Sequence, residues 1–173
     1  MIDATGLELI ARNVRERVDG ADAVSTSFAY EQATLKVAPS AVHPVLSFLK
    51  TEAAEPWEFL ASVHACDYYP EEPRLGVHYQ LVSMGRTERL GLKTRLRIEE
   101  PRVRTVTDLF ATANFQEREI FDFFGIEFEG HPDLRRIHMP EDYVGHPQRR
   151  DFPIGGEPVI FTFNEPKMPR WYA

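Results

Sequence analysis

Cysteine is almost missing from the sequence: Cys66 is the only one among 173 residues. A single cysteine excludes a disulfide within the chain. It also cannot hold an iron–sulfur cluster, which needs about four thiolates. Cys66 lies in the apolar run 59–66, where we expect a buried and unreactive thiol. The chain by itself is therefore not expected to carry cysteine-based redox chemistry.

Long apolar runs are also missing. No stretch approaches the ~20 apolar residues that a membrane-spanning helix requires. Residues 1–13 lack both the apolar core of a signal peptide and the acid-poor composition of a transit peptide. The net charge of −7 argues against a nucleic-acid surface and against attraction to anionic lipid. We expect a chain that does not span a membrane, binds no nucleic acid and is not exported.

Common catalytic motifs are absent as well. The sequence has no HExxH, no GxSxG and no glycine-rich phosphate loop. A metal site remains an alternative, because His131, His138 and His146 lie close to several acidic residues. Their spacings of seven and eight residues do not match the tight ligand pairs of zinc sites. The simpler interpretation is that these histidines hydrogen-bond the backbone of a loop.

What is present indicates one globular domain. The chain is 43% hydrophobic and 27% charged, and it is long enough to bury a core. Its hydrophobic patterns predict helices over 5–18, 41–54 and 115–124, strands over 23–30, 33–38, 57–66, 75–82 and 90–98, and a short helical segment from Thr107. Thr5 is the expected N-cap of the first helix. This order predicts an α+β fold, an antiparallel or mixed sheet with helices packed on one face, followed by a long ordered loop and an extended C-terminal tail.

Residues 117–153, EREIFDFFGIEFEGHPDLRRIHMPEDYVGHPQRRDFP, form the most distinctive part of the chain. We call them the signature segment. An amphipathic helix opens it, and Gly125 is expected to end that helix. Two His-Pro steps then follow in a stretch too irregular for helix or sheet. Ordered loops of this length in compact domains are usually functional.

The charges of this segment admit several roles. We expect Glu117, Glu119 and Asp122 to be solvated or paired with arginines rather than catalytic. Ile120, Phe121 and Phe124 are expected to bury their helix. The arginine pairs 135–136 and 149–150 either lock the loop internally or contact a partner, and simple exposure is the third possibility.

The end of the chain differs in composition. From Asp151 onwards it is rich in proline, low in charge and still aromatic, ending in Trp171 and Tyr172. Such a tail is too apolar for disorder, and we expect it to lie extended on another surface. The sequence thus predicts a core domain over 1–124, a loop over 125–151 and a partner-binding tail over 152–173.

The signature segment resembles the 30-kDa subunit, or C-subunit, of proton-pumping NADH:quinone oxidoreductase, respiratory complex I. Upstream, Asp67-Tyr68-Tyr69 and the strand 77–81 also fit that family. Phe115 and His138 depart from its pattern, although Phe115 is expected to keep an aromatic packing role. The matching positions include Glu117, Arg118, Glu119, Asp122, Gly125, His131, Pro132, Asp133, Arg135, Arg136, His146, Pro147, Arg149, Arg150, Asp151 and Phe152.

The resemblance implies a non-catalytic structural subunit of the hydrophilic arm, with these positions and the tail as interface residues. It would support the large hydrogenase-like subunit, or D-subunit, and be held by its partners at the cytoplasmic side of the plasma membrane. Iron–sulfur clusters, FMN and quinone would lie in partner subunits, and catalytic, cofactor and metal residues would be absent from this chain. The alternatives are a homologous subunit of a membrane-bound hydrogenase, or of an enzyme fed by reduced coenzyme F420, and a stand-alone metal-dependent enzyme.

Overall fold

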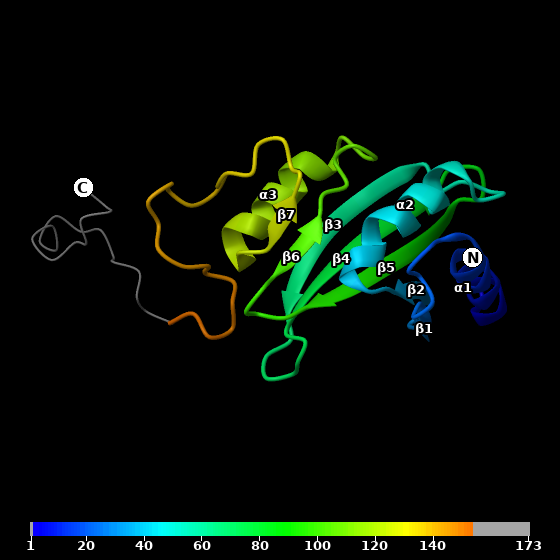
Figure 1. Cartoon of the computed structure of the whole chain (residues 1–173), viewed down its shortest axis with the longest axis horizontal. Helices are drawn as coiled ribbons and strands as arrows, with labels where there is room; N and C mark the ends of the chain where they lie inside the picture. Colours follow the sequence, from blue (N-terminus) through cyan, green and yellow to red (C-terminus); the bar gives the residue numbers. More distant parts are fainter. Residues whose placement is uncertain (1, 154–173) are drawn as a thin grey trace, which may run out of the picture.

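A computed structural model describes residues 2–153, which form an α+β fold around one mixed five-stranded sheet (Figure 1). The strand order is β1-β2-β5-β4-β3. In chain order, the elements are α1 Ala4–Arg17, β1 Ser25–Ala29, β2 Gln32–Lys36, the 3-10 helix η1 Pro39–Ala41, α2 Val42–Thr51, β3 Phe59–Asp67, β4 Leu75–Ser83, β5 Glu88–Leu96, β6 Arg102–Arg104, α3 Ala113–Phe124 and β7 Glu127–Glu129. The predicted α+β class is confirmed, and the tail 154–173 lies outside the described residues.

The first helix, α1, begins one residue earlier than predicted. Asp3 is its N-cap, and its carboxylate accepts a hydrogen bond of 2.7 Å from the Gly6 amide. Thr5 lies inside the first turn, so the prediction that Thr5 caps the helix was wrong. Aspartate caps helices at least as well as threonine, and Asp3 therefore competes successfully for the role.

The sheet combines a hairpin with a meander. Tyr30 and Glu31 join β1 to β2 with φ angles of 50° and 61°, as a two-residue hairpin turn requires. Strands β3, β4 and β5 are antiparallel neighbours, which confirms the predicted meander. Strand β2 pairs with β5 in parallel, and this pairing makes the sheet mixed.

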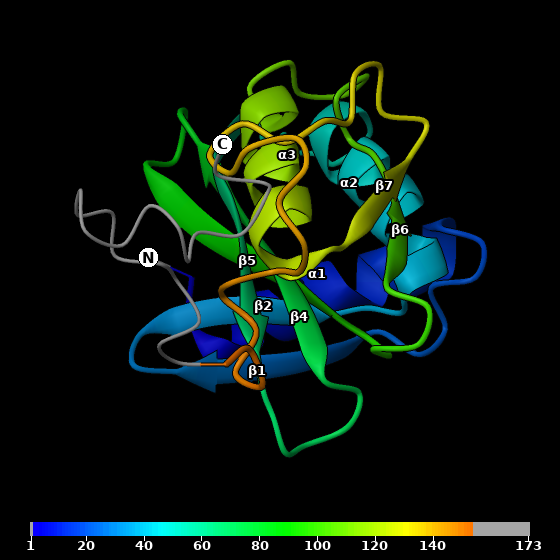
Figure 2. The same ribbon diagram turned by 90° about the vertical axis from the view of Figure 1, so that its left-hand side faces the viewer.

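One face of the sheet carries the core. Along β4, Leu75, Val77, Tyr79 and Leu81 are buried, and they share one core with residues of all three α-helices. Figure 2 shows α2 and α3 over this face of the sheet. The alternate β4 residues, Gly76, His78, Gln80 and Val82, point to the opposite side, which we call the open face.

Cys66 lies on the open face, opposite Gly76, and is exposed. The prediction of a buried thiol was therefore wrong. The run 59–66 is apolar overall, but a strand turns alternate residues to opposite sides. Whether Cys66 is buried depends on which face of the sheet the helices cover, and the apolar run alone does not specify that face.

A second, parallel two-stranded sheet was not predicted. Strand β6 pairs with β7, and Val103 and Phe128 are register partners buried in the main core together with Ile126. The residues after Thr107 form turns, where a short helix was expected. The first part of the signature segment thus contributes to the main core, and the division of the chain at residues 124 and 151 stays a prediction.

Helix α3 buries a different set of side chains than predicted. Ile120 and Phe124 are buried as expected, whereas Phe121 is partly exposed. Glu117 and Asp122 are fully buried, so neither carboxylate is solvated. The packing role expected for Phe115 was wrong as well, because 67% of this residue is exposed.

Candidate functional site

The signature segment runs from α3 through β7 and then past α3 towards the end of the β3–β4 hairpin (Figures 1 and 2). Its residues after Gly130 contain no helix or strand, as far as residue 153. Backbone groups in such a segment need partners from elsewhere in the chain. Three groups of polar side chains lie in or beside the segment, and they supply several of these partners.

The first group is centred on the Asp122 carboxylate. One carboxylate oxygen, Oδ2, accepts three consecutive amides, at 3.1 Å from Ile137, 2.7 Å from His138 and 2.9 Å from Met139. The other oxygen pairs with Arg136 at 2.8 Å. Burial alone would raise the pKa of Asp122, but these hydrogen bonds outweigh it and hold the pKa below its usual value. Asp122 therefore stays ionised and fixes the loop on α3.

The end of α3 is closed by the second His-Pro step. Gly125 ends the helix in the left-handed region, at a φ of 69°. The Arg149 side chain donates to the Phe124 carbonyl at 2.7 Å, and His146 Nδ1 donates to the Asp122 carbonyl at 3.0 Å. A Cβ at Gly125 would lie 2.6 Å from Arg149 Nη2. This position therefore needs glycine for two reasons: the φ angle is positive, and neighbouring side chains leave no room for a Cβ.

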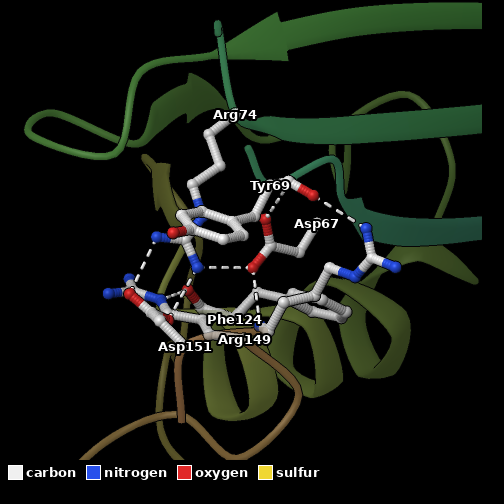
Figure 3. Close-up of polar contacts among 7 residues, drawn as sticks. Asp67, Tyr69, Arg74, Phe124, Arg149 and Asp151 are labelled. Atoms are coloured by element: carbon white, nitrogen blue, oxygen red, sulfur yellow. Dashed lines mark hydrogen bonds and ion pairs between the residues drawn. The ribbon is translucent and has the colours of Figure 1, made fainter. Parts of the chain in front are cut away.

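The second group links the segment to the β3–β4 hairpin through Arg74 (Figure 3). Arg74 pairs with Asp67 through contacts of 2.8 and 2.6 Å and with Asp151 through another two of 2.8 and 2.6 Å. The Arg150 amide also donates to Asp67 at 2.7 Å, and the Arg150 guanidinium donates to the Tyr69 carbonyl at 2.8 Å. We call these residues the Arg74 cluster.

Charge pairing is strong in the Arg74 cluster because two of its members are buried. The side chains of Arg74 and Asp67 are 6% and 1% exposed. The bond from Arg74 holds the pKa of Asp67 far below its usual range, and the two carboxylates raise the pKa of the Arg74 guanidinium. A doubly bidentate arginine of this kind fixes geometry as well as adding energy.

The third group surrounds Glu117 on the buried side of α3. Its carboxylate accepts hydrogen bonds from the Val106 amide at 2.9 Å and the Thr105 hydroxyl at 2.5 Å. Burial raises the pKa of Glu117 to about 7, and the two hydrogen bonds offset only part of that rise. Glu117 Oε2 lies 3.9 Å from His131 Nε2.

The geometry around His131 determines its tautomer. The Asp133 amide donates to His131 Nδ1 at 3.0 Å, so Nδ1 is unprotonated. Nε2 therefore carries the proton and donates to the Asn114 carbonyl at 3.1 Å. The first His-Pro step is thus tied to the start of α3.

Other signature residues remain at the surface. The Arg118 side chain donates to the Arg135 carbonyl at 3.2 Å. Arg135 pairs with Asp133, and both side chains are at least half exposed. Glu119 is half exposed and lies 3.7 Å from His138, whose ring stacks on Phe123. Glu119 thus contacts a histidine where a loop arginine was the expected partner, whereas Asp122 pairs with an arginine of the loop as expected.

Two partners of these groups escaped the sequence analysis. Asp67 was noted only as part of the resemblance, and Arg74 and Thr105 were not singled out. A buried arginine carries no local signal, because its partners lie 7 and 77 positions away. Trp171 and Tyr172 lie outside the described residues.

Possible metal ligands do not converge within residues 2–153: no group of three His, Cys, Asp or Glu side chains there could hold a metal ion. The same part of the chain contains no helix long and apolar enough to cross a membrane. The clustered polar groups instead bond to backbone and to each other, and this arrangement gives the segment a fixed shape.

Comparisons with known proteins agree on one family. The model of the respiratory-chain NADH dehydrogenase 30-kDa subunit matches residues 35–158. The NADH-quinone oxidoreductase C-subunit of Roseiflexus castenholzii is 42% identical over 135 residues, which cover 78% of this chain and 78% of that one. A C-subunit of the same enzyme from Rhizobium meliloti is 47% identical over 120 residues, which cover 69% of this chain and 65% of that one.

Solved structures share the fold. A trypsin-resistant fragment of Nqo5 superposes with a TM-score of 0.63 and 32% identity, covering 74% of this chain and 98% of the fragment. A chain of the archaeal membrane-bound sulfane sulfur reductase superposes with a TM-score of 0.69, covering 85% of each chain, at 23% identity. The second likeness concerns the fold alone.

Proposed function

Because the chain belongs to the family of the 30-kDa subunit of respiratory-chain NADH dehydrogenase, we propose that it works as that subunit in an NADH:quinone oxidoreductase. In this role it is a structural subunit of the hydrophilic arm. The assembled enzyme passes electrons from NADH to quinone and translocates protons, and this chain supplies binding surface.

The observation that carries this proposal is how the family's signature residues are used. Asp122, Arg136, His146 and Arg149 bind backbone groups of α3 or of the loop, and Asp151 binds Arg74. The hydrogen bonds of these side chains hold the loop in one conformation. Groups arranged for catalysis would instead converge on a space that a substrate can enter.

Exposed residues in the signature segment and just before it support a docking surface. Phe115 is 67% exposed and the Arg135 side chain 64%, and Arg118 contacts both of them. Arginines and aromatic residues are common anchors of protein interfaces. We assign this strip, with Glu119 and the tail from Phe152 to Trp171 and Tyr172, to contact with the large hydrogenase-like subunit.

Cofactors and location follow from this role. Iron–sulfur clusters, FMN and quinone belong to partner subunits, and this chain is held peripherally at the cytoplasmic side of the membrane by those partners. We keep the core, loop and tail as separate units in this proposal, with the tail as the partner-binding one.

The proposal is tested by purifying the complex through a tag on the full chain. Mass spectrometry should identify the large hydrogenase-like subunit among the co-purified chains, and the preparation should oxidise NADH with a quinone acceptor. Arg135→Glu should reduce co-purification. Arg104→Glu is its matched control, because the Arg104 side chain is 63% exposed and lies on β6. Equal yields from the two variants would refute the assignment of the strip.

The same preparation separates the alternatives. Co-purified hydrogenase subunits with hydrogen-dependent activity, or oxidation of reduced coenzyme F420 in place of NADH, would identify a homologous complex. A pure chain that binds stoichiometric metal and elutes without partners would support a stand-alone enzyme and refute the structural role.

A further inference from the structure

The open face of the five-stranded sheet carries a row of basic side chains. Lys36 on β2 is the register partner of Lys93 on β5, Lys93 is the partner of His78 on β4, and His78 is the partner of His64 on β3. We call these four residues the basic row. Register partners point to the same side of a sheet, so all four lie on the open face.

The basic row contains two lysines that are register partners, Lys36 and Lys93. Two lysines directly opposite each other on paired strands repel, and like-charged pairs of this kind are destabilising. Lys36 is exposed and makes no ion pair within residues 2–153. The chain as a whole carries a net charge of −7, so a concentration of positive charge on one face is not a consequence of composition.

The row is also held in place. Lys93 donates to the Tyr68 hydroxyl at 2.6 Å, and that hydroxyl lies 2.9 Å from His78 Nε2. Since the hydroxyl accepts from Lys93, it donates its own proton to His78. Burial and the nearby cations lower the pKa of His78 to about 4, which leaves its ring neutral and able to accept. His64 stacks on His78 with 5.0 Å between ring centres.

The Tyr68 ring lies on the open face next to the basic row. A Cβ on Gly76 would lie 2.6 Å from the Tyr68 ring, so the ring packs on bare backbone. The Arg95 guanidinium lies 3.9 Å from the centre of the same ring, and it donates to the Pro73 carbonyl at 2.6 Å. Two cations, Lys93 and Arg95, therefore lie against one aromatic ring, and Arg95 also lies 3.7 Å from the exposed Glu71 carboxylate.

The other end of the open face carries exposed apolar side chains. A groove of about 1060 Å³ lies there, and its lining combines apolar residues such as Phe59, Val82 and Met84 with charged ones, Glu31, Glu88 and Arg89. Phe59 is 48% and Met84 69% exposed. The open face thus has a basic end and an end with exposed apolar side chains on the same strands.

We propose that the open face binds a segment of a partner subunit, with carboxylates over the basic row and apolar side chains in the groove. This inference rests on the proposed function, which supplies partner subunits. Charge decides between possible occupants. Residues 154–173 of this chain carry two acidic and two basic residues and so bring no excess negative charge. A second copy, or an anionic membrane, would be repelled by the net charge of −7.

The test uses the tagged full chain in its complex and two substitutions at Lys36. Carbodiimide joins a lysine amine to a carboxylate in contact, without a spacer. We expect cross-links from Lys36 to an Asp or Glu of a co-purified subunit. Lys36→Arg should keep assembly and lose these cross-links, because a guanidinium does not react in this way.

Charge reversal gives the second readout. Lys36→Glu together with Arg95→Glu should lower the partner's co-purified yield roughly tenfold at low salt. The single Lys36→Glu variant should melt no lower than the wild type, because the introduced carboxylate would pair with Lys93 where two lysines now repel. A purely structural role for Lys36 predicts the opposite result, a lower melting temperature. Arg104→Glu is the control and should leave the yield unchanged.

Several outcomes would overturn the inference. They are unchanged yield in the double variant, Lys36 cross-links only to a second copy of this chain, or Lys36-dependent sedimentation of the chain with phosphatidylglycerol vesicles. A complex that assembles fully without Lys36 cross-links would refute this inference and leave the proposed function standing. A chain that co-purifies with no other subunit would refute both.

Discussion

Arg74, immediately before β4, forms a bidentate pair with Asp151, 77 positions later in the chain, through contacts of 2.8 and 2.6 Å. This pair joins the far end of the signature segment to the β3–β4 hairpin (Figure 3). The same guanidinium pairs with the buried Asp67. One side chain thus couples the sheet to the loop, and this coupling leads to the first prediction.

Arg74→Ala should destabilise the chain by about 3–5 kcal/mol, because it leaves the Asp67 carboxylate buried without its cation. Asp151→Asn should cost no more than about 1 kcal/mol, because the Asp151 side chain is 53% exposed. Urea unfolding of both variants measures the difference. Similar losses in the two variants would show that Asp67 does not depend on Arg74.

Asp122→Asn should lower the free energy of unfolding by about 1.5–3 kcal/mol or more, because this is the range for a hydrogen bond to a charged group. An amide in this place has only one oxygen, whereas the carboxylate serves three amides through one oxygen and Arg136 through the other. Glu119→Gln, on the same helix but half exposed, should change stability by no more than about 0.5 kcal/mol. Thermal melts and limited proteolysis after Arg135 and Arg136 distinguish the two variants. Equal resistance would argue against the role of Asp122 in holding the loop.

Glu117 should make stability fall as pH rises from 4.5 to about 7. Its pKa is about 7 in the folded chain against a usual value of 4.5. A carboxyl whose folded pKa is raised stabilises the fold fully below its unfolded pKa, and this contribution is lost as pH rises to the folded pKa. The loss is at most about 3 kcal/mol, from the size of the shift. Asp67 and Asp122 have lowered pKa values, so their contributions change only at more acidic pH.

The measurement is a difference between wild type and Glu117→Gln at pH 5 and pH 8. His64, His78 and His146 have lowered pKa values, but these histidines are common to both proteins and their contributions cancel in the difference. We expect wild type to be the more stable at pH 5 and to lose this advantage by pH 8. A difference in stability that does not vary with pH would contradict a raised pKa for Glu117.

Truncation after Pro153 should leave a chain that unfolds cooperatively and no longer co-purifies with partner subunits. Among the described residues, the buried hydrophobic side chains run from Ile2 to Tyr143, and the Arg74–Asp151 pair is retained in this variant. Truncation after Val144 removes Asp151, His146 and Arg149 and should destabilise the chain markedly. Chemical unfolding and tag purification report the two properties separately. An insoluble chain ending at Pro153 would place the tail in the domain's own core.

Much of the local structure could be predicted from the sequence. The alternation Leu75, Val77, Tyr79, Leu81 predicts a strand with one buried face, and Gly125 predicts the end of α3, because both signals are contained in a few neighbouring residues. Strands β6 and β7 were missed because each is three residues long and is stabilised by the other, which lies far away in the chain. The burial of Cys66 was predicted wrongly because an apolar run does not say which face the helices cover.

The sequence by itself determined the fold class, the family and the segment on which function depends, since these rest on periodicity and on residue identities in order. Only the tertiary structure decided what each charge does. It buries Glu117 and Asp122, exposes Glu119 between them, and brings Arg74 to Asp151. It also aligns Lys36 with Lys93 through the parallel pairing of β2 and β5. The free energy of a charge depends on its burial and its partners in space, and neither can be read from neighbours along the chain.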